Sequence, residues 1–182
     1  MRVAVTGTPG TGKTSAVEAL EASDEGVPDD LEVVHLNDVI EPEGLYEEHD
    51  EERDSLVVDV EAITEYLAGR QDVLIESHLA HHFDVDRVIV LRCAPEELER
   101  RLERRGEDDP AKAESDASIA ENAESEALDV ILAEAVDRHG RGAVYEIETT
   151  DLTPEDVASE IRAATVGDRD PSAGTVNYTD YF

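Results

Sequence analysis

The stretch that decides the fold is Gly7-Thr8-Pro9-Gly10-Thr11-Gly12-Lys13-Thr14. It matches the pattern G-x-x-x-x-G-K-[ST], follows the apolar run Val3–Val5, and precedes a helical pattern over residues 16–20. Glycines at these positions let backbone N–H groups turn toward an anion, and the following helix directs its positive end at the same place. The alternative is a glycine turn with an incidental lysine. The pattern favours a nucleoside-triphosphate site, and residues 7–14 are called the phosphate loop below.

Two side chains of the phosphate loop and two beyond it are candidates for the chemistry. Lys13 places a positive charge at the β- and γ-phosphate oxygens, and the Thr14 hydroxyl can ligate Mg²⁺. Glu76 follows the apolar strand at residues 73–75, which is where such proteins hold the acid that positions Mg²⁺, here through water. His78 could orient a water or a hydroxyl near the γ-phosphate. The alternative for Glu76 and His78 is a solvated glutamate and a loop histidine.

Apolar runs and helical patterns alternate along the chain. Strands are expected at residues 3–5, 31–36, 73–75, 88–91 and 144–147, and helices at residues 16–20, 59–68, 95–106, 112–138 and 153–164. This order predicts an α/β P-loop NTPase fold over residues 1–165, with a parallel five-stranded sheet and helices on both faces. Residues 37–58 are expected to form an irregular acidic excursion. The chain from residue 166 shows no periodicity, so a loose tail is expected, although its aromatic end could instead dock on the core or a partner.

The composition restricts the classes of function. The 182 residues carry a formal net charge of −32, with 40% hydrophobic and 34% charged residues. One domain with its own core is therefore expected, and a protein that coats bare nucleic acid is excluded because phosphates repel this charge. Lys13 and Lys112 are the only lysines. An acidic, lysine-poor surface is typical of proteins that stay dissolved in concentrated salt, so a halophilic source is expected.

The cellular location can also be inferred from composition. Cys93 is the single cysteine, which excludes an intrachain disulfide and favours a reducing compartment. No apolar run approaches the roughly 18 residues of a membrane span, and the apolar segment at residues 3–6 is too short for a secretory signal. We therefore expect a soluble, cytoplasmic protein without membrane contact or direct contact with nucleic acid.

Four arginines share the helix expected at residues 95–106. Glu96 and Glu97 stand four residues before Arg100 and Arg101, an order that favours salt bridges. Arg104 and Arg105 instead have arginines four residues behind them, which is unfavourable without an anion nearby. Part of the pattern would be explained by cations at the end of a helix. We favour a phosphate clamp, because arginine binds phosphate through two parallel hydrogen bonds.

Three histidines lie between the strands expected at residues 73–75 and 88–91. His78, His81 and His82 could supply nitrogen ligands to zinc, but the chain has one cysteine and no second cluster of ligand residues. The three-histidine zinc site is therefore an alternative to ordinary loop histidines.

Several motifs occur together in one order. They are Thr6 with the phosphate loop, Leu45-Tyr46, Asp50-Glu51-Glu52, the apolar strand into Glu76-Ser77-His78, and Arg104-Arg105-Gly106. Over about residues 2–165 they resemble adenylate kinase isoenzyme 6, a small nuclear and archaeal family of nucleoside-monophosphate kinases that is also linked to maturation of the small ribosomal subunit. The chain departs from that family at Glu76, where an aspartate is usual, and at Glu41, where an arginine is common.

The resemblance implies which residues bind the nucleotides. It implies a kinase core with a monophosphate-binding insertion at about residues 36–58 and a short lid at about residues 104–114. Asp38, Leu45 and Tyr46 would contact the monophosphate. The residues that would contact ATP are Gly10, Thr11, Gly12, Lys13, Thr14, Ser15 and the lid arginine, Arg105.

The expected reaction is in-line transfer of the γ-phosphoryl group of ATP to AMP or another nucleoside monophosphate, with Mg²⁺ as cofactor. Lys13, Glu76, His78 and Arg105 are the catalytic candidates, and Thr14 and Glu76 are the candidates for holding the metal. If His78 holds a water in line, the same site would hydrolyse ATP. The alternative function is an ATP-dependent assembly factor that binds and releases a small-subunit ribosomal protein, because an acidic face suits a basic partner.

Overall fold

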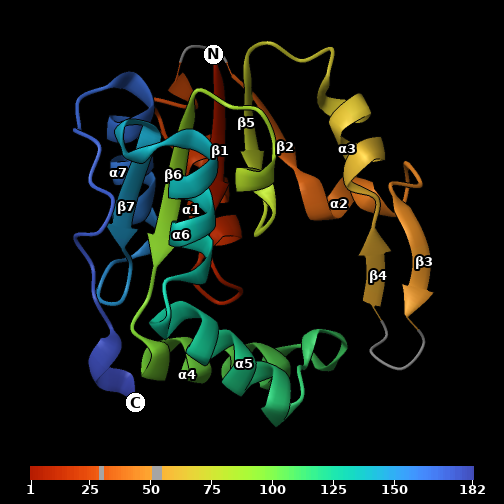
Figure 1. Cartoon of the computed structure of the whole chain (residues 1–182), viewed down its shortest axis with the longest axis vertical. Coiled ribbons are helices and arrows are strands. Elements are labelled where there is room, and N and C mark those ends of the chain that lie inside the picture. Colours follow the sequence, from red (N-terminus) through yellow and green to blue (C-terminus); the bar gives the residue numbers. More distant parts are fainter. Residues whose placement is uncertain (29–30, 51–54) are drawn as a thin grey trace.

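Figure 1 shows the computed structural model of the chain, which describes residues 1–28, 31–50 and 55–182. Five strands form one parallel sheet in the order β2-β5-β1-β6-β7, which confirms the predicted sheet. The strands are β1 (Arg2–Thr6), β2 (Glu32–His35), β5 (Val73–Glu76), β6 (Arg87–Arg92) and β7 (Val144–Glu148). The apolar runs of the central strands β1, β5 and β6 follow from burial on both faces, because these strands have almost no exposed residue.

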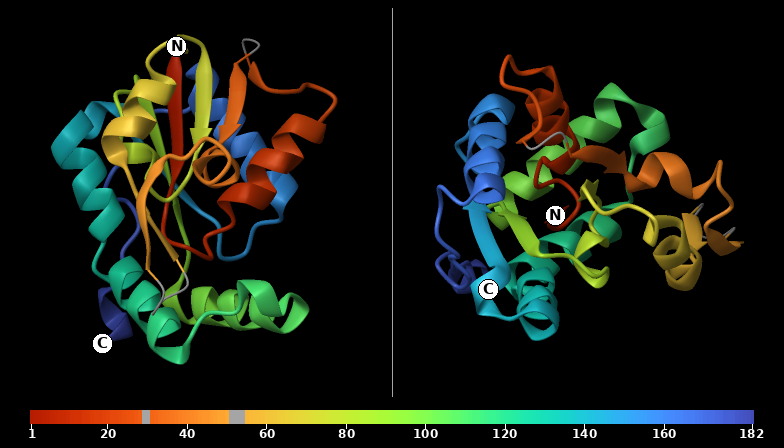
Figure 2. Two further views of the ribbon diagram at one scale, coloured as in Figure 1. Left: turned by 90° about the vertical axis from the view of Figure 1, so that its right-hand side faces the viewer. Right: turned by 90° about the horizontal axis from the view of Figure 1, so that it is seen from above.

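Helices cover both faces of the sheet, as predicted (Figure 2). On one face α1 (Lys13–Ala22) and α7 (Pro154–Val166) pack side by side over Val3 and Val5. On the other face α3 (Val60–Leu67) and α6 (Val130–His139) share a core with Ala4. The alternation along β1 is the two-residue period of a strand, and it divides the core into these two layers. No helix among the described residues has the length and apolarity needed to cross a membrane.

Two further helices lie beyond the carboxyl ends of the strands (Figure 1). They are α4 (Pro95–Asp108) and α5 (Asp116–Ala127), joined through the 3-10 helix η3 (Pro110–Lys112). The predicted helix end at Gly106 is wrong, because α4 continues to Asp108. Gly106 is needed there for close packing: a Cβ atom would lie 3.0 Å from the Cα of Ala113, where the chain returns.

The acidic segment after β2 is more regular than the sequence indicated. It contains α2 (Leu36–Ile40) and an antiparallel hairpin of β3 (Tyr46–Asp50) and β4 (Ser55–Val58). Gly44, with a φ of 67°, turns the chain so that the Leu45 N–H donates to the Ile40 carbonyl at 2.8 Å. The expectation of an irregular excursion is therefore wrong. Residues 51–54, which include part of the Asp50-Glu51-Glu52 motif, lie outside the described residues.

The single helix predicted for residues 112–138 is wrong. Its place is taken by η3, α5 and α6, and the break falls at Asp129, which has a φ of 56°. The break lets Asp129 Oδ1 and the Glu126 carbonyl both accept from Arg92, at 2.5 and 3.1 Å. Arg92 is 1% exposed, and Glu126 and Glu146 also accept from its guanidinium. A buried charge needs such partners, so the tertiary ion pairs override the helical pattern.

Beyond α7 the chain, for which either a loose tail or docking on the core was expected, makes specific contacts with the core. Tail residues follow the outer edge of β7, where the Ser172 N–H donates to the Val144 carbonyl and the Ser172 hydroxyl accepts from Glu146 N–H. The Thr175 N–H donates to the Glu146 carboxylate at 2.7 Å. Tyr178 lies over the Arg92 guanidinium at 5.3 Å. The tail thus covers the unpaired edge of the sheet with specific hydrogen bonds, which have no periodicity for a sequence pattern to reveal.

Candidate nucleotide-binding site

A cavity of about 1030 Å³ lies between the phosphate loop, the end of β5, the start of α2 and helix α4. It is at the upper end of the usual range for ligand sites, and it lies at the carboxyl ends of parallel strands, where such sheets bind ligands. The basic residues that line it make up a third of the lysines and arginines of the chain: Lys13, Arg101, Arg104, Arg105 and Lys112. Six carboxylates line the same cavity, so its lining carries no net positive charge: Glu18, Asp38, Glu76, Asp108, Asp109 and Glu114. A phosphate ligand is therefore indicated by where the cations lie, at Lys13 of the phosphate loop and at the arginines of α4.

The phosphate loop has the backbone of an anion cradle. Gly10 and Gly12 have φ angles of 93° and 92°, a region that side chains rarely adopt, and α1 begins directly after them. A Cβ atom on Gly10 would lie 3.1 to 3.2 Å from Leu98 and Leu102 of α4, so the loop packs tightly under that helix. Thr11 is buried beneath the loop and its hydroxyl donates to the Thr8 carbonyl at 2.9 Å. The packing against α4 and the Thr11–Thr8 hydrogen bond hold the cradle in this shape.

Lys13 is buried within this cradle. Its ammonium donates to the Thr8 carbonyl at 3.1 Å. Burial lowers the pKa of Lys13 to about 8, and the nearby Arg105 lowers it too, against the opposing charges of Glu76 and Glu126. A phosphate group would replace the water that burial removes, and would stabilise the charged form of Lys13.

The candidate metal-binding side chains are in contact. Thr14 Oγ1 donates to Glu76 Oε1 at 3.3 Å, and Glu76 is 2% exposed. A hydroxyl and a carboxylate are the hard oxygen donors that Mg²⁺ takes, so this donor set fits that ion. The other oxygen of Glu76 lies 2.9 Å from His35 Nδ1, and His35 Nε2 lies 3.1 Å from Glu21.

His35 was missed by the sequence analysis. It ends β2 and pairs in register with Glu76 at the end of the neighbouring β5. Two residues that end adjacent parallel strands lie side by side. The position of His35 at the end of an expected strand would have indicated this contact if the order of the strands in the sheet had been known. Burial acts to lower the pKa of His35, but hydrogen bonds with Glu76 and Glu21 outweigh it and leave that pKa raised.

His78 lies where the sequence analysis expected, on the wall of the cavity. Burial, with a smaller contribution from the Lys13 charge, lowers the pKa of His78 to about 4. Its ring is therefore neutral near pH 7 and carries one N–H donor and one nitrogen acceptor.

Three of the four arginines of α4 face the cavity: Arg101, Arg104 and Arg105. Glu97 accepts hydrogen bonds from Arg100, Arg101 and Arg104 at 2.9 to 3.2 Å, and Glu114 accepts from Arg105. Of the two expected salt bridges, Glu97–Arg101 is present, whereas Arg100 pairs with Glu97 and not with Glu96. Glu97 also pairs with Arg104, which was not expected. The salt bridges are partly exposed, however, so a bound phosphate can compete with these carboxylates for the arginines.

The predicted monophosphate contacts divide into two groups. Asp38, in α2, lines the cavity opposite α4, and so does its neighbour Asn37. Leu45 is buried in the hydrophobic core, with its N–H and carbonyl both bonded within the chain. Tyr46 is 36% exposed at the start of β3 and is absent from the cavity wall. The structure brings Asp38, but not the Leu45 and Tyr46 side chains, to the phosphate loop.

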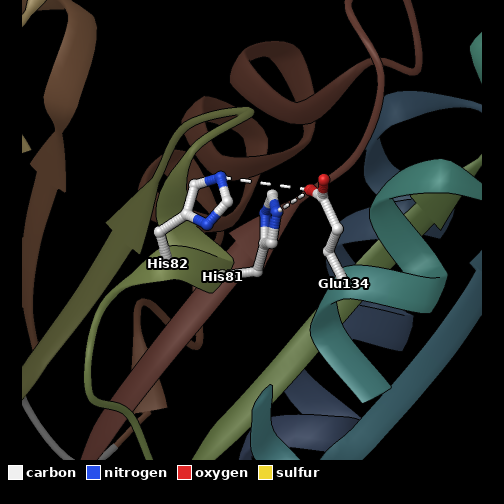
Figure 3. A group of neighbouring side chains, drawn as sticks. All are labelled: His81, His82 and Glu134. Atoms are coloured by element: carbon white, nitrogen blue, oxygen red, sulfur yellow. Dashed lines mark hydrogen bonds and ion pairs between the residues drawn. The ribbon is translucent and has the colours of Figure 1, made fainter. Parts of the chain in front are cut away.

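The histidines do not form the three-histidine cluster considered above. His78 lines the nucleotide cavity, whereas His81 and His82 lie beside Glu134 of α6 (Figure 3). Burial lowers the pKa of His81, so its ring is neutral near pH 7.

Comparison with known proteins gives the family. The model of the AAA domain family matches residues 3–129. Proteins named "Putative adenylate kinase" from Halobacterium salinarum and Natronomonas pharaonis are 58% and 57% identical to the whole chain, which covers 99% and 100% of them. One of the same name from Methanosarcina acetivorans is 42% identical over 88% of this chain and 84% of its own length. The chain therefore belongs to the AAA domain family, and within it to the family of these proteins named "Putative adenylate kinase".

Solved structures agree with this family on the fold. A gluconokinase from Sinorhizobium meliloti 1021 is similar with a TM-score of 0.52 and 16% identity, over 91% of both chains. A sulfotransferase from Alicyclobacillus acidocaldarius is similar with a TM-score of 0.51 and 14% identity, over 98% of this chain and 86% of the other. At these identities the likeness shows the P-loop fold alone.

One polar network of this family member links the phosphate loop to the break between α5 and α6, and the sequence analysis missed it. The Thr8 hydroxyl donates to Glu126 Oε2 at 2.5 Å, and Glu126 Oε1 accepts from Arg92 at 2.7 Å. Arg92 in turn donates to Glu146 of β7 at 2.6 Å. The Thr8 side chain of the loop is thereby held by charged groups that are themselves buried and paired.

Proposed function

We propose that this protein is an adenylate kinase of the isoenzyme 6 type, which transfers the γ-phosphoryl group of ATP to AMP or another nucleoside monophosphate. The observation that carries the proposal is the cavity itself, in which the phosphate loop faces three arginines of α4. Membership of a family whose relatives are named as adenylate kinases supports the choice of reaction.

On the ATP side the phosphate loop binds the β- and γ-phosphates. The backbone at Gly10 and Gly12 supplies N–H donors at the start of α1, and Lys13 supplies a positive charge. The Thr11 N–H donates to the Thr8 carbonyl, so the proposed contribution of Thr11 is to hold the loop in shape. The next side chains, Thr14 and Ser15, line the same cavity. Mg²⁺, held by Thr14 and by Glu76 directly or through water, would neutralise charge that develops on the phosphate oxygens.

On the monophosphate side the proposal relies on the insertion and the lid. Asp38 in α2 faces the cavity from the insertion at residues 36–58. The lid at residues 104–114 contains both members of the Arg105–Glu114 pair, so its closure on a phosphate would exchange Glu114 for the phosphate. In the transfer, a monophosphate oxygen forms a bond to the γ-phosphorus while the bond to ADP breaks, and Arg105 stabilises the charge.

The site also supports hydrolysis of ATP. His78 is neutral and lies on the cavity wall, so it can accept a hydrogen bond from a water near the γ-phosphate. We expect Lys13→Ala to abolish both phosphoryl transfer and hydrolysis, because both need the γ-phosphate held. His78→Ala should reduce hydrolysis more than transfer, because only hydrolysis needs the positioned water.

The deciding experiment measures ADP formation from ATP and each nucleoside monophosphate in molar KCl with Mg²⁺. Stimulation by AMP that Lys13→Ala abolishes supports the kinase. The alternative, an ATP-dependent assembly factor, would give ATP hydrolysis that AMP leaves unchanged and a basic small-subunit ribosomal protein increases. Calorimetry with Mg²⁺ and ATP is the prior control, because a chain that takes up no nucleotide would contradict both functions.

The proposed setting is the cytoplasm, where ATP and AMP are available. Cys93 is a free, buried cysteine, and burial raises the pKa of its thiol to about 11, which keeps it unreactive.

A further inference from the structure

We propose that His81, His82 and Glu134 form a binding site for a divalent transition-metal ion of the zinc class, separate from the nucleotide cavity. The two histidines come from the 3-10 helix η2 (Ala80–His82) and the glutamate from α6. Their ligand atoms all lie within 4.8 Å of one another, and the side chains converge as Figure 3 shows. None of the three lines the nucleotide cavity, so the inference does not depend on the proposed kinase activity.

The distances are close to those of a metal centre. His81 Nε2 lies 3.0 Å from Glu134 Oε2, and His82 Nε2 lies 4.0 Å from the same oxygen. Ligands about 2.0–2.1 Å from a tetrahedral zinc ion are separated by about 3.3 Å. The His82 and Glu134 side chains are 36% and 50% exposed. Both can therefore change rotamer at the surface and bring the 4.0 Å between His82 Nε2 and Glu134 Oε2 to the separation of two metal ligands. Three protein ligands leave a fourth position open to water.

The hydrogen bonds around His81 hold its outer nitrogen, Nε2, against the Glu134 carboxylate. The Thr6 hydroxyl lies 3.2 Å from the His78 carbonyl, which has no other donor among the described residues, and 3.0 Å from His81 Nδ1. A hydroxyl has one proton, so if Thr6 donates to the carbonyl it must accept from His81 Nδ1. A ring with its proton on Nδ1 presents the Nε2 lone pair to a cation, 3.0 Å from the Glu134 carboxylate. A ring with its proton on Nε2 donates that proton to Glu134 instead, so the two tautomers distinguish a site ready for metal from an ordinary hydrogen bond.

The supporting contacts resemble the surroundings of metal-bound histidine. Such a histidine usually donates its second ring nitrogen to an oxygen, which fixes the tautomer and the ring orientation. Thr6 would have that role here. His139 Nε2 lies 2.7 Å from the His81 carbonyl and holds the backbone of η2 in place. His81 itself is 1% exposed, so the least mobile ligand is already oriented toward the other two.

The ligand set selects the kind of ion. Two imidazole nitrogens with one carboxylate suit zinc and its neighbours among the transition metals, whereas Mg²⁺ and Ca²⁺ prefer oxygen ligands throughout. Millimolar Mg²⁺ for a kinase would therefore not fill this site. A bound ion would tie η2 to α6, and η2 follows His78 along the chain and contacts β1 just before the phosphate loop. Its expected role is to fix this wall of the cavity.

The test uses the full chain and Co²⁺, whose visible absorption reports the number and kind of its ligands. The titration is done in molar KCl with excess Mg²⁺, so that weak binding to surface carboxylates is suppressed. We expect about one Co²⁺ per chain and displacement by Zn²⁺. His82→Ala and Glu134→Gln should each weaken binding by about tenfold or more, the size of effect seen when even an outer partner of a metal is removed. Asp137→Asn is the matched control, because this exposed residue lies on the same helix and loses the same charge.

Failure of the wild-type chain to bind Co²⁺ or Zn²⁺ would overturn the inference, and so would equal binding by all three variants. Circular dichroism of the metal-free variants shows whether each one folds. Nitrogen NMR of the histidine rings gives a measurement that needs no variant. The His81 ring should carry its proton on Nδ1 without metal and its Nε2 signal should move when Zn²⁺ is added. A proton on Nε2 and an unmoved signal would contradict the site.

Discussion

At the scale of single residues, Lys13 combines two properties that oppose each other in the free protein. It is the lysine that the phosphate loop pattern requires, yet it is buried, and burial lowers its pKa to about 8. A bound polyphosphate stabilises the ammonium form, so the pKa of Lys13 must rise when ATP binds. Binding is therefore linked to proton uptake wherever free Lys13 is partly deprotonated.

The first prediction follows from this linkage. Affinity for ATP should be level below about pH 8 and fall above it by up to about tenfold per pH unit, because free Lys13 must then be protonated on binding. Calorimetry in two buffers of different ionisation enthalpy should detect proton uptake between about pH 8 and 9. Lys13→Arg is the control, since a guanidinium stays charged and should take up no proton. Equal proton uptake by Lys13→Arg would assign the effect to another group.

Arg105 is the residue through which the lid is expected to act. Arg105→Ala should lower kcat/KM for phosphoryl transfer by about 10²-fold or more, because it removes a donor aimed at the developing charge. Arg100→Ala is the matched control: Arg100 pairs with the same helix's Glu97 but does not line the cavity. A similar loss of kcat/KM in both variants would mean that the rate depends on the net positive charge of α4 and not on the position of Arg105. Steady-state kinetics with AMP varied at saturating ATP provides the measurement.

At this scale the sequence revealed the residues whose pattern is local. The phosphate loop spacing and the polar residues after a buried strand located Lys13, Thr14, Glu76 and His78, and all four line one cavity. His35 was missed because its link to Glu76 depends on which strands are neighbours, and Leu45 was misplaced because its core packing depends on the turn at Gly44.

At the scale of elements, the strands and most helices follow from apolar periodicity, and the exceptions have a common cause. Asp129 ends a helical pattern because its carboxylate binds Arg92, and the tail is ordered because its polar groups bind β7. Both effects involve partners more than 20 residues away in the chain. Apolar periodicity reports only the local preference of a segment, so it cannot predict these distant contacts, which override helix propensity.

The tail gives a prediction at this scale. Deleting residues 168–182 should lower the free energy of unfolding by about 2–4 kcal/mol, because several hydrogen bonds worth about 0.5–1.5 kcal/mol each are lost along β7. Urea unfolding at fixed molar KCl provides the measurement. Deleting Phe182 alone is the control, because this residue is 71% exposed and its loss should change stability by less than about 0.5 kcal/mol. A truncated chain as stable as the full chain would restore the expectation of a loose tail.

At the scale of the whole molecule, charge is the dominant property. A net charge of −32 on 182 residues opposes the compact state, because like charges are brought together on folding. Dissolved ions screen this repulsion over about 10 Å at 0.1 M salt and over about 3 Å at 1 M. Five of the fifteen lysines and arginines line the nucleotide cavity and Arg92 is buried in an ion pair, so few cations remain to balance the acidic outer surface.

The free energy of unfolding should therefore rise steadily as KCl is raised from about 0.1 M to molar concentrations. Changing the exposed Glu61, Glu103 and Glu121 together to glutamine should make the protein more stable at low salt and flatten this dependence, because less repulsion remains to be screened. Urea titrations of both proteins at each salt concentration provide the comparison. If repulsion is the cause, the two curves converge at high KCl. Parallel curves would mean that salt stabilises both proteins by strengthening the hydrophobic effect, and not by screening repulsion. Full stability at about 0.1 M KCl would contradict the expected adaptation to salt.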